Sequence, residues 1–147
     1  MKKRIAAALA AFLCLCGLTA CSGQENGLQN GYYTAQAAEF SHGWKEFVTI
    51  TVRGGRITAV GYNAINESGF VKSWDNDYMN AMKSVTGTYP NEYTRSYAAQ
   101  MLERQDADID AISGATSSAG SFRKLAEAVL DQSRQGNSQT VIVDTAE

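Results

Sequence analysis

The chain has few of the residues that build redox or metal centres in small proteins. Its 147 residues include 3 cysteines, 1 histidine and 1 proline. The cysteines are Cys14, Cys16 and Cys21, so no thiol for a disulfide, a CxxC pair or a thiolate metal site follows residue 21. With His42 as the single histidine, we expect no zinc site. Any redox activity would therefore depend on a bound cofactor.

An excess of basic charge is also missing. The formal net charge is -2, from 13 basic and 15 acidic residues. Three of the basic residues are Lys2, Lys3 and Arg4, and without them 10 basic residues face 15 acidic ones. A net acidic chain is a poor match for nucleic-acid phosphates, so we expect no nucleic-acid partner. A hydrophobic fraction of 44% and a charged fraction of 19% indicate one globular domain.

The N-terminus has the layout of a secretory signal peptide. Lys2–Arg4 precede an apolar run, Ile5–Gly17, that is shorter than the ~20 residues needed to span a bilayer. The following Leu18-Thr19-Ala20-Cys21 resembles a bacterial lipobox, in which the sulfur of the cysteine carries a diacylglycerol. The alternative is a plain signal peptide with a chance cysteine. We predict a lipoprotein signal peptide over 1–20, with the protein lipid-anchored on the extracytoplasmic face of the bacterial cell membrane.

Residues 21–30 are polar and glycine-rich, which predicts a flexible tether before a folded domain over 31–147. Alternating β-branched runs on both sides of Gly54-Gly55 predict a β-hairpin. Apolar residues at helical spacing predict three helices. The fold class is therefore α+β, a small antiparallel sheet with a hairpin packed against about three helices. The expected strands are 32–38, 47–52, 56–62 and 139–143, and the expected helices are 75–85, 91–105 and 117–132.

The segment from Asp110 to Ser118, Asp-Ala-Ile-Ser-Gly-Ala-Thr-Ser-Ser, carries the main chemical signal. Gly114 allows a backbone conformation that a β-carbon would forbid, and the small residues around it leave room for a bulky group. Hydroxyl residues follow where a helix begins, so we expect one of them to be the N-cap. The free N–H groups and the dipole of that helix favour an anion such as phosphate. From spacing alone, the alternative is a capped helix after a tight loop.

The pattern Asp-x-x-Ser-Gly-Ala-Thr-x-Ser resembles the flavinylation motif of the FMN-binding domain family. That family includes the C subunit of sodium-translocating NADH:quinone reductase, the G subunit of the Rnf complex and many secreted lipoproteins. The resemblance implies that FMN is attached to Thr116 through a phosphoester, by a flavin transferase that uses FAD as donor and magnesium as its metal. The other matched residues around the attachment site are Asp110, Ser113, Gly114, Ala115 and Ser118, and we also expect Ser117, which lies between Thr116 and Ser118, to bind the cofactor.

A second stretch resembles the family's Glu-Thr-Pro-Gly-like loop, which lies against the isoalloxazine ring. The matching residues are Glu67, Ser68 and Gly69, followed by Phe70. Lys72 matches a lysine of many small members and is either a cation near the N1–O2 edge of the reduced flavin or a solvated lysine. We therefore expect Glu67, Ser68, Gly69, Phe70 and Lys72 to be flavin contacts.

These features predict an electron carrier that holds covalent FMN and passes electrons between a membrane donor and an external acceptor. No catalytic triad or acid pair points to substrate turnover. Two alternatives stay open. The first is a lipoprotein that binds or stores flavin without a covalent bond, and the second is a structural or antigenic surface lipoprotein in which the motif is only a helix cap.

Overall fold

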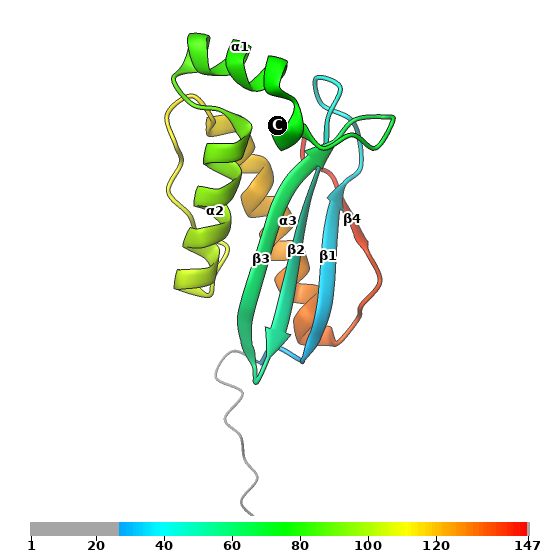
Figure 1. The fold of residues 1–147 in the computed structure, drawn as a ribbon. Helices are drawn as coiled ribbons and strands as arrows, with labels where there is room; N and C mark the ends of the chain where they lie inside the picture. Colours follow the sequence, from blue (N-terminus) through cyan, green and yellow to red (C-terminus); the bar gives the residue numbers. More distant parts are fainter. Residues whose placement is uncertain (1–26, 147) are drawn as a thin grey trace, which may run out of the picture.

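The computed structural model describes residues 27–146. The predicted signal peptide over 1–20, the lipidation residue Cys21 and most of the predicted tether lie outside the described residues. Figure 1 shows the arrangement of the strands and helices. In chain order they are β1 (Gly31–Ala37), β2 (Lys45–Arg53), β3 (Arg56–Ile65), the short 3-10 helix η1 (Lys72–Trp74), α1 (Asn76–Thr86), α2 (Pro90–Arg104), α3 (Thr116–Gln135) and β4 (Val141–Val143).

The strands form one mixed sheet in the order β3-β2-β1-β4. β1, β2 and β3 are antiparallel, and Gly54 and Gly55 form the turn of the predicted hairpin with φ of 60° and 74°. β4 instead pairs parallel with β1, with Ala35 opposite Val141. The predicted antiparallel sheet therefore holds for three strands. β4 differs because α3 carries the chain back along the sheet before β4 begins, and hydrophobic patterns do not show this direction.

Two helices cover one face of the sheet and form the core with it (Figure 1). α3 packs on β1 and β2, whereas α2 packs on β3. Alternate residues of each strand are buried, and the residues between them are mostly only partly buried, as in a sheet with one covered face. The predicted α+β fold is confirmed. Buried residues at the centre of the core include Tyr33, Val48, Ile50, Tyr97, Phe122, Leu125 and Val129.

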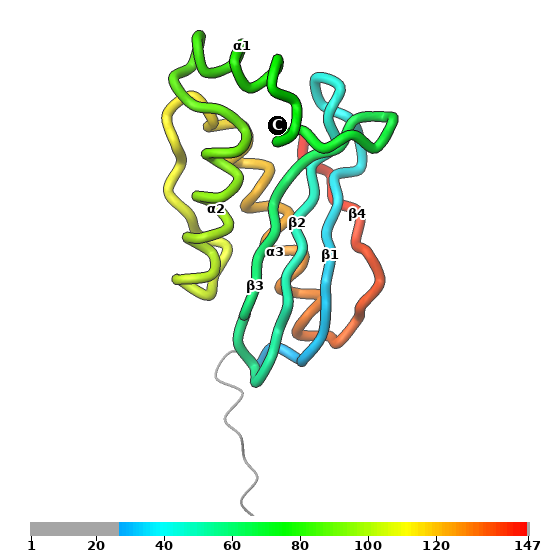
Figure 2. The backbone as a smooth tube through the Cα atoms, in the orientation of Figure 1, coloured from blue at the N-terminus to red at the C-terminus, as the bar shows by residue number. Residues whose placement is uncertain are grey.

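The motif segment and the start of the domain lie at opposite ends of α3. The backbone N–H of Gln29 donates to the carbonyl of Ser133 at 3.0 Å, near the C-terminal end of the helix. Thr116 is the first residue of α3, and the helix has 20 residues. At 1.5 Å per residue, the two ends are about 30 Å apart. In Figure 2, the β2–β3 turn is at the bottom of the molecule and α1 is at the top, above the start of α3.

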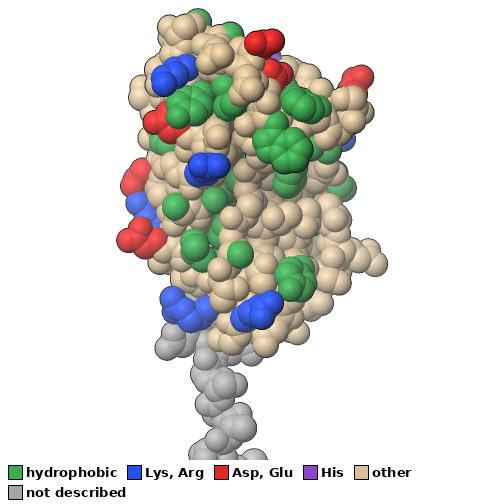
Figure 3. All heavy atoms as spheres, viewed as in Figure 1, with side chains coloured by type: hydrophobic (Ala, Val, Ile, Leu, Met, Phe, Trp, Pro, Cys, Tyr) green, Lys and Arg blue, Asp and Glu red, His purple; other side chains and the backbone are tan. Residues whose placement is uncertain are grey.

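The surface carries both signs of charge. On the face seen in Figure 3, basic and acidic side chains are interspersed, with apolar side chains between them. Within residues 27–146, no helix combines the length and the hydropathy that a membrane span requires.

Candidate functional site

Gly114 is required by its own conformation and by a close neighbour. Its φ is 83°, in the left-handed region that side chains disfavour. A β-carbon added to Gly114 would lie 2.6 Å from the carbonyl oxygen of Thr86 and 2.9 Å from its Cβ. The predicted need for glycine is confirmed. The end of α1 occupies the space on the side where a β-carbon would point, whereas Gly114 and Ala115 also line a cleft.

Tyr97 of α2 fixes the two sides of the same loop. Its hydroxyl donates to the carbonyl of Ala115 at 3.0 Å and accepts from the N–H of Ile112 at 3.0 Å. The Ala115 N–H also donates to the Ile112 carbonyl at 2.9 Å, which closes the turn. Tyr97 is fully buried, and burial raises the pKa of its phenol, so the hydroxyl keeps its proton. The loop before Thr116 is therefore held from the core side.

The first turn of α3 has no side-chain cap. Its N-cap is Ala115, so the expectation that Thr116, Ser117 or Ser118 is the N-cap is wrong. The physical reason is that the buried Ala115 side chain packs in the core, which makes Thr116 the first helical residue. Among the described residues, the N–H groups of Thr116 to Ser118 have no hydrogen-bond acceptor. Free N–H groups at a helix N-terminus bind anions well.

The Thr116 side chain is exposed, and its hydroxyl makes no hydrogen bond within residues 27–146. A cleft of about 160 Å³ lies next to it, and we call this the motif cleft. A second hollow of about 350 Å³ adjoins it and shares four of its lining residues. The motif cleft is lined by Ser41, His42, Trp44, Glu46, Lys72, Tyr78, Met82, Tyr93, Gly114, Ala115, Ser117, Ser118 and Ser121.

Lys72 supplies a buried positive charge to the motif cleft. Its side chain is 8% exposed, and its Nζ lies 5.1 Å from the ring centre of Tyr78 and 5.8 Å from that of Trp44. The two rings meet edge to face, with centroids 5.7 Å apart. Burial lowers the pKa of Lys72, and the negative charge of Glu46 opposes this effect. Lys72 has no ion-pair partner among the described residues.

Glu46 connects the cleft to the start of α3. Its carboxylate accepts a hydrogen bond from the Tyr62 hydroxyl at 2.8 Å, and that hydroxyl also lies 3.2 Å from the carbonyl oxygen of Ser118. Burial raises the pKa of Tyr62, and the nearby Glu46 charge raises it further. Tyr62 therefore stays a hydrogen-bond donor, and it ties β2, β3 and the first turn of α3 together.

The structure brings only part of the predicted site together. Lys72, Gly114, Ala115, Ser117 and Ser118 share the motif cleft, and Thr116 lies beside it. The predicted ring contacts of the 67–70 segment do not line this cleft. Their exposed loop is closed on itself by the Asn66 side chain, whose Oδ1 accepts three hydrogen bonds from within the loop at 2.7 to 3.0 Å.

Two other predicted site residues face solvent. Ser113 is exposed, and the carboxylate of Asp110 pairs with Arg104 at 2.5 Å. Sequence reasoning did not select Trp44, Glu46 or Tyr78 as site residues, although all three line the motif cleft. The spacing of Trp44 and Glu46 contained a signal, because residues two apart at the start of a strand point to the same face. No local signal in the sequence places Tyr78 beside them.

The fold and the site define a class of protein. An α+β domain presents a hydroxyl and free N–H groups at a helix N-terminus, next to a cleft with aromatic rings and a buried cation. This arrangement suits a cofactor that has both a phosphate and an aromatic ring. Residues 43–131 match the FMN-binding domain family, which is more than half of the chain. The chain belongs to this family.

Two relatives cover most of the domain. A 15 kDa lipoprotein of Treponema pallidum (strain Nichols) is 36% identical over 133 residues, which are 88% of this chain and 93% of that protein. The crystal structure of a Clostridium perfringens protein superposes with a TM-score of 0.77 at 40% identity. It covers 80% of this chain and 98% of that one.

The described residues fit FMN in two respects. Among the described residues, the free N–H groups of Thr116 to Ser118 match the phosphate, and the buried Lys72 charge, which forms no salt bridge there, matches the electron-rich edge of a flavin ring. The motif cleft alone, at about 160 Å³, is small for a whole flavin, but the adjoining hollow of about 350 Å³ extends the available space.

Proposed function

We propose that the protein is a lipid-anchored, extracytoplasmic flavoprotein. In this proposal it carries FMN through a phosphoester on Thr116 and passes electrons between a membrane donor and an external acceptor. The observation that carries the proposal is the exposed Thr116 hydroxyl, which has no hydrogen bond within residues 27–146 and lies beside helix N–H groups that are also free there and beside the motif cleft. The lipoprotein relative supports the predicted anchor at Cys21, which lies outside the described residues.

The chain's own residues would bind and orient the cofactor. The N–H groups of Thr116, Ser117 and Ser118 would hold the phosphate oxygens, with the α3 dipole favouring their negative charge. Trp44 and Tyr78 would provide apolar surface for the ring inside the cleft. Bound FMN supplies one- or two-electron chemistry that no side chain of this domain offers. A covalent link also prevents loss of the cofactor outside the cell.

A flavin transferase that uses FAD as donor and magnesium as its metal would be the first partner. The side chains of Asp110 and Ser113 are exposed, so such an enzyme has access to the residues of the motif that precede Thr116. The Gly114 turn and the Tyr97 hydrogen bonds would present the threonine in one fixed position. The membrane would be the second partner, through the lipid on Cys21.

The direct test is the intact mass of the denatured protein after coexpression with a flavin transferase. We expect a gain equal to FMN minus water, located on the peptide that contains Thr116. Thr116→Ala should remove this gain completely. Thr140→Ala is the matched control, because Thr140 is also exposed but lies near β4, away from the motif cleft, and it should keep full labelling.

Three results would contradict the proposal in different ways. A yellow protein that loses its flavin on denaturation would indicate reversible flavin binding or storage. A colourless, unmodified protein would indicate a lipoprotein without a flavin role. Labelling that persists in Thr116→Ala would show that another hydroxyl, such as that of Ser117 or Ser118, is the attachment site.

A further inference from the structure

Lys72 is a buried cation that forms no salt bridge among the described residues, and the nearby charge of Glu46 offsets only part of the effect of burial on its pKa. It is 8% exposed and lines the motif cleft, and its Nζ lies over the rings of Trp44 and Tyr78. Burying a cation costs free energy unless an anion or a hydrogen-bond acceptor compensates it. The cleft therefore contains a positive charge available to a bound anionic group.

We propose that Lys72 stabilises the negative charge that reduction places on the flavin ring, and thereby raises the reduction potential of the bound cofactor. This inference rests on the proposed function, because it needs FMN at Thr116. Two electrons from the membrane donor and one proton from water, taken at N5, give the reduced ring one net negative charge. An ammonium group held beside that charge favours the reduced form over the oxidised form.

The backbone around Lys72 is fixed by neighbours outside the cleft. The Asn63 side chain of β3 donates to the Ser73 hydroxyl at 2.7 Å and accepts from the Ser73 N–H at 3.3 Å. An isolated antiparallel bridge also joins Val71 to Ile65 at the end of β3. Lys72 lies between these two attachments, so its side chain enters the cleft from a rigid element. Because the ammonium group is already in position, the protein does not have to rearrange to stabilise the reduced ring.

On balance, the other groups that line the cleft also favour the binding of an anion. Glu46 is the one acidic residue of its lining, and within the described residues its carboxylate accepts a hydrogen bond from the Tyr62 hydroxyl and forms no salt bridge with Lys72. The N-terminal end of α3 also lines the cleft and adds the positive end of the helix dipole. The exposed side chain of His42 also lines the cleft.

The test compares reduction potentials of the FMN-loaded, full-length protein by equilibration with a reference dye. We expect Lys72→Met to lower the ratio of reduced to oxidised flavin at least tenfold at a fixed dye potential. For a two-electron couple this corresponds to about 30 mV. Lys72→Arg should stay within about threefold of the wild type, because it keeps the charge.

Lys83→Met is the matched control. The Nζ of Lys83 lies 5.1 Å from the ring centre of Tyr89, so this lysine also packs on an aromatic ring, but it is exposed and does not line the motif cleft. Its loss should leave the potential unchanged. The stability of the flavin-free protein gives a second readout, and Lys72→Met should be at least as stable as the wild type because it removes a buried charge. A purely structural role for Lys72 predicts a less stable variant and an unchanged potential.

The outcomes separate this inference from the proposed function. A wild-type protein without FMN by mass would overturn both. A loaded Lys72→Met protein with the wild-type potential would overturn only the role of Lys72. A Lys72→Met protein that fails to load, while the wild type loads, would assign Lys72 to cofactor attachment and would also overturn the inference.

Discussion

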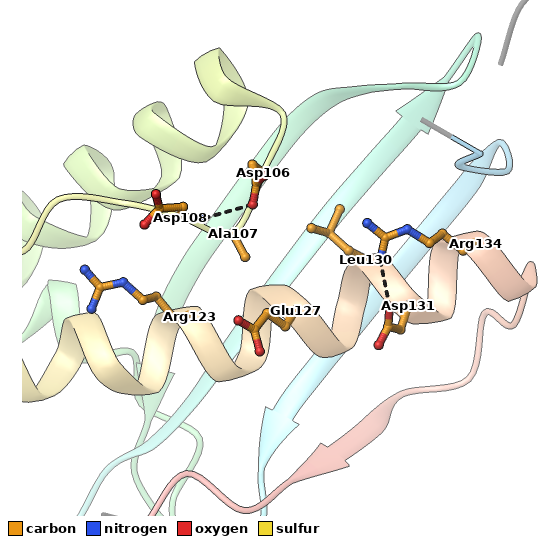
Figure 4. A pocket seen from close by; sticks show the side chains of 8 residues that line it. All are labelled: Asp106, Ala107, Asp108, Arg123, Glu127, Leu130, Asp131 and Arg134. Carbon is orange, nitrogen blue, oxygen red and sulfur yellow. Dashed lines mark hydrogen bonds and ion pairs between the residues drawn. The ribbon is translucent and has the colours of Figure 1, made fainter. Parts of the chain in front are cut away.

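The motif cleft and a larger cleft farther along α3 differ in their charged groups, and the larger one is the less suitable site. The larger cleft, which we call the distal cleft, has a volume of about 460 Å³, whereas the motif cleft has a volume of about 160 Å³. Figure 4 shows its side chains, with dashed lines for the Arg134–Asp131 ion pair and the contact between Asp106 and Asp108. The distal cleft is lined by Asp106, Ala107, Asp108, Arg123, Glu127, Leu130, Asp131 and Arg134.

The difference between the clefts is in how their charges are compensated. Both cations of the distal cleft have partners, since Arg134 pairs with Asp131 at 2.7 Å and Arg123 donates to the carbonyl of Ile109. In the motif cleft, Lys72 is buried without an ion pair among residues 27–146, and the N–H groups at the start of α3 are free. Polar groups that still lack a partner, more than the volume of a cleft, indicate a binding site.

The largest effect should come from Gly114→Ala, which tests whether the motif loop is a rigid platform. The new β-carbon would clash with Thr86 and would also strain the positive φ. We expect a loss of about 3 kcal/mol in the free energy of unfolding, from strain and overpacking together. FMN labelling by the transferase should fall at least tenfold. Urea denaturation and intact mass measure the two effects.

Gly87→Ala is the control that separates strain from the clash. Gly87 has nearly the same φ, 80°, but nothing lies within 4 Å of an added β-carbon. It should cost about 1 kcal/mol and leave labelling unchanged. Equal labelling of the Gly114→Ala and wild-type proteins would show that the loop does not need this geometry for attachment.

The next effect should come from Tyr97→Phe, which removes the support of the loop from the core side. The variant loses hydrogen bonds to the Ala115 carbonyl and the Ile112 N–H, both at 3.0 Å. We expect a stability loss of about 1–2 kcal/mol, because the partly buried Ile112 N–H loses its partner, whereas the Ala115 carbonyl keeps its hydrogen bond from the Ala119 N–H. The rate of FMN transfer to Thr116 should also fall several-fold, which a labelling time course measures.

Tyr33→Phe is the matched control at the other end of the molecule. Tyr33 is also buried, and its hydroxyl donates to backbone carbonyls of Gln29 at 3.0 Å and Asn30 at 3.4 Å. It should lower stability by a similar amount with no change in labelling rate. A rate that falls equally in both variants would mean that labelling follows global stability rather than the motif loop.

Local patterns predicted most of the fold. The hairpin at Gly54-Gly55, the end of α1 at Gly87 and the three helices follow from glycine chemistry and hydrophobic spacing. The parallel pairing of β4 did not, because strand direction depends on the path of α3 across the sheet. The start of α3 was also wrong in detail, since burial of Ala115 outweighs the capping preference of the hydroxyl residues that follow it.

The candidate site could be predicted only in part, because tertiary packing brings some of its residues together. The Ser-Gly-Ala-Thr segment and Lys72 stand out in the sequence, but the partners of Lys72 come from separate elements. Trp44 precedes β2 and Tyr78 lies in α1, so their meeting over one lysine is a property of the packed structure. The loop at 67–70 shows the reverse case, in which a sequence match lies outside the motif cleft.

The smallest effect should come from Arg134→Ala, which tests whether the distal cleft contributes to function. The side chains of Arg134 and Asp131 are 51% and 66% exposed, and solvent screens an ion pair at that exposure. We expect a change of about 0.5 kcal/mol or less in the free energy of unfolding, with labelling and flavin potential unchanged. A shift in reduction potential like that expected for Lys72→Met would mean that a charge at the far end of α3 also affects the flavin. The presence or absence of ion-pair partners would then not explain why one cleft is a site and the other is not. With no shift, the distal cleft is a hollow beside one solvated ion pair, and the charges within the motif cleft set the reduction potential of the flavin.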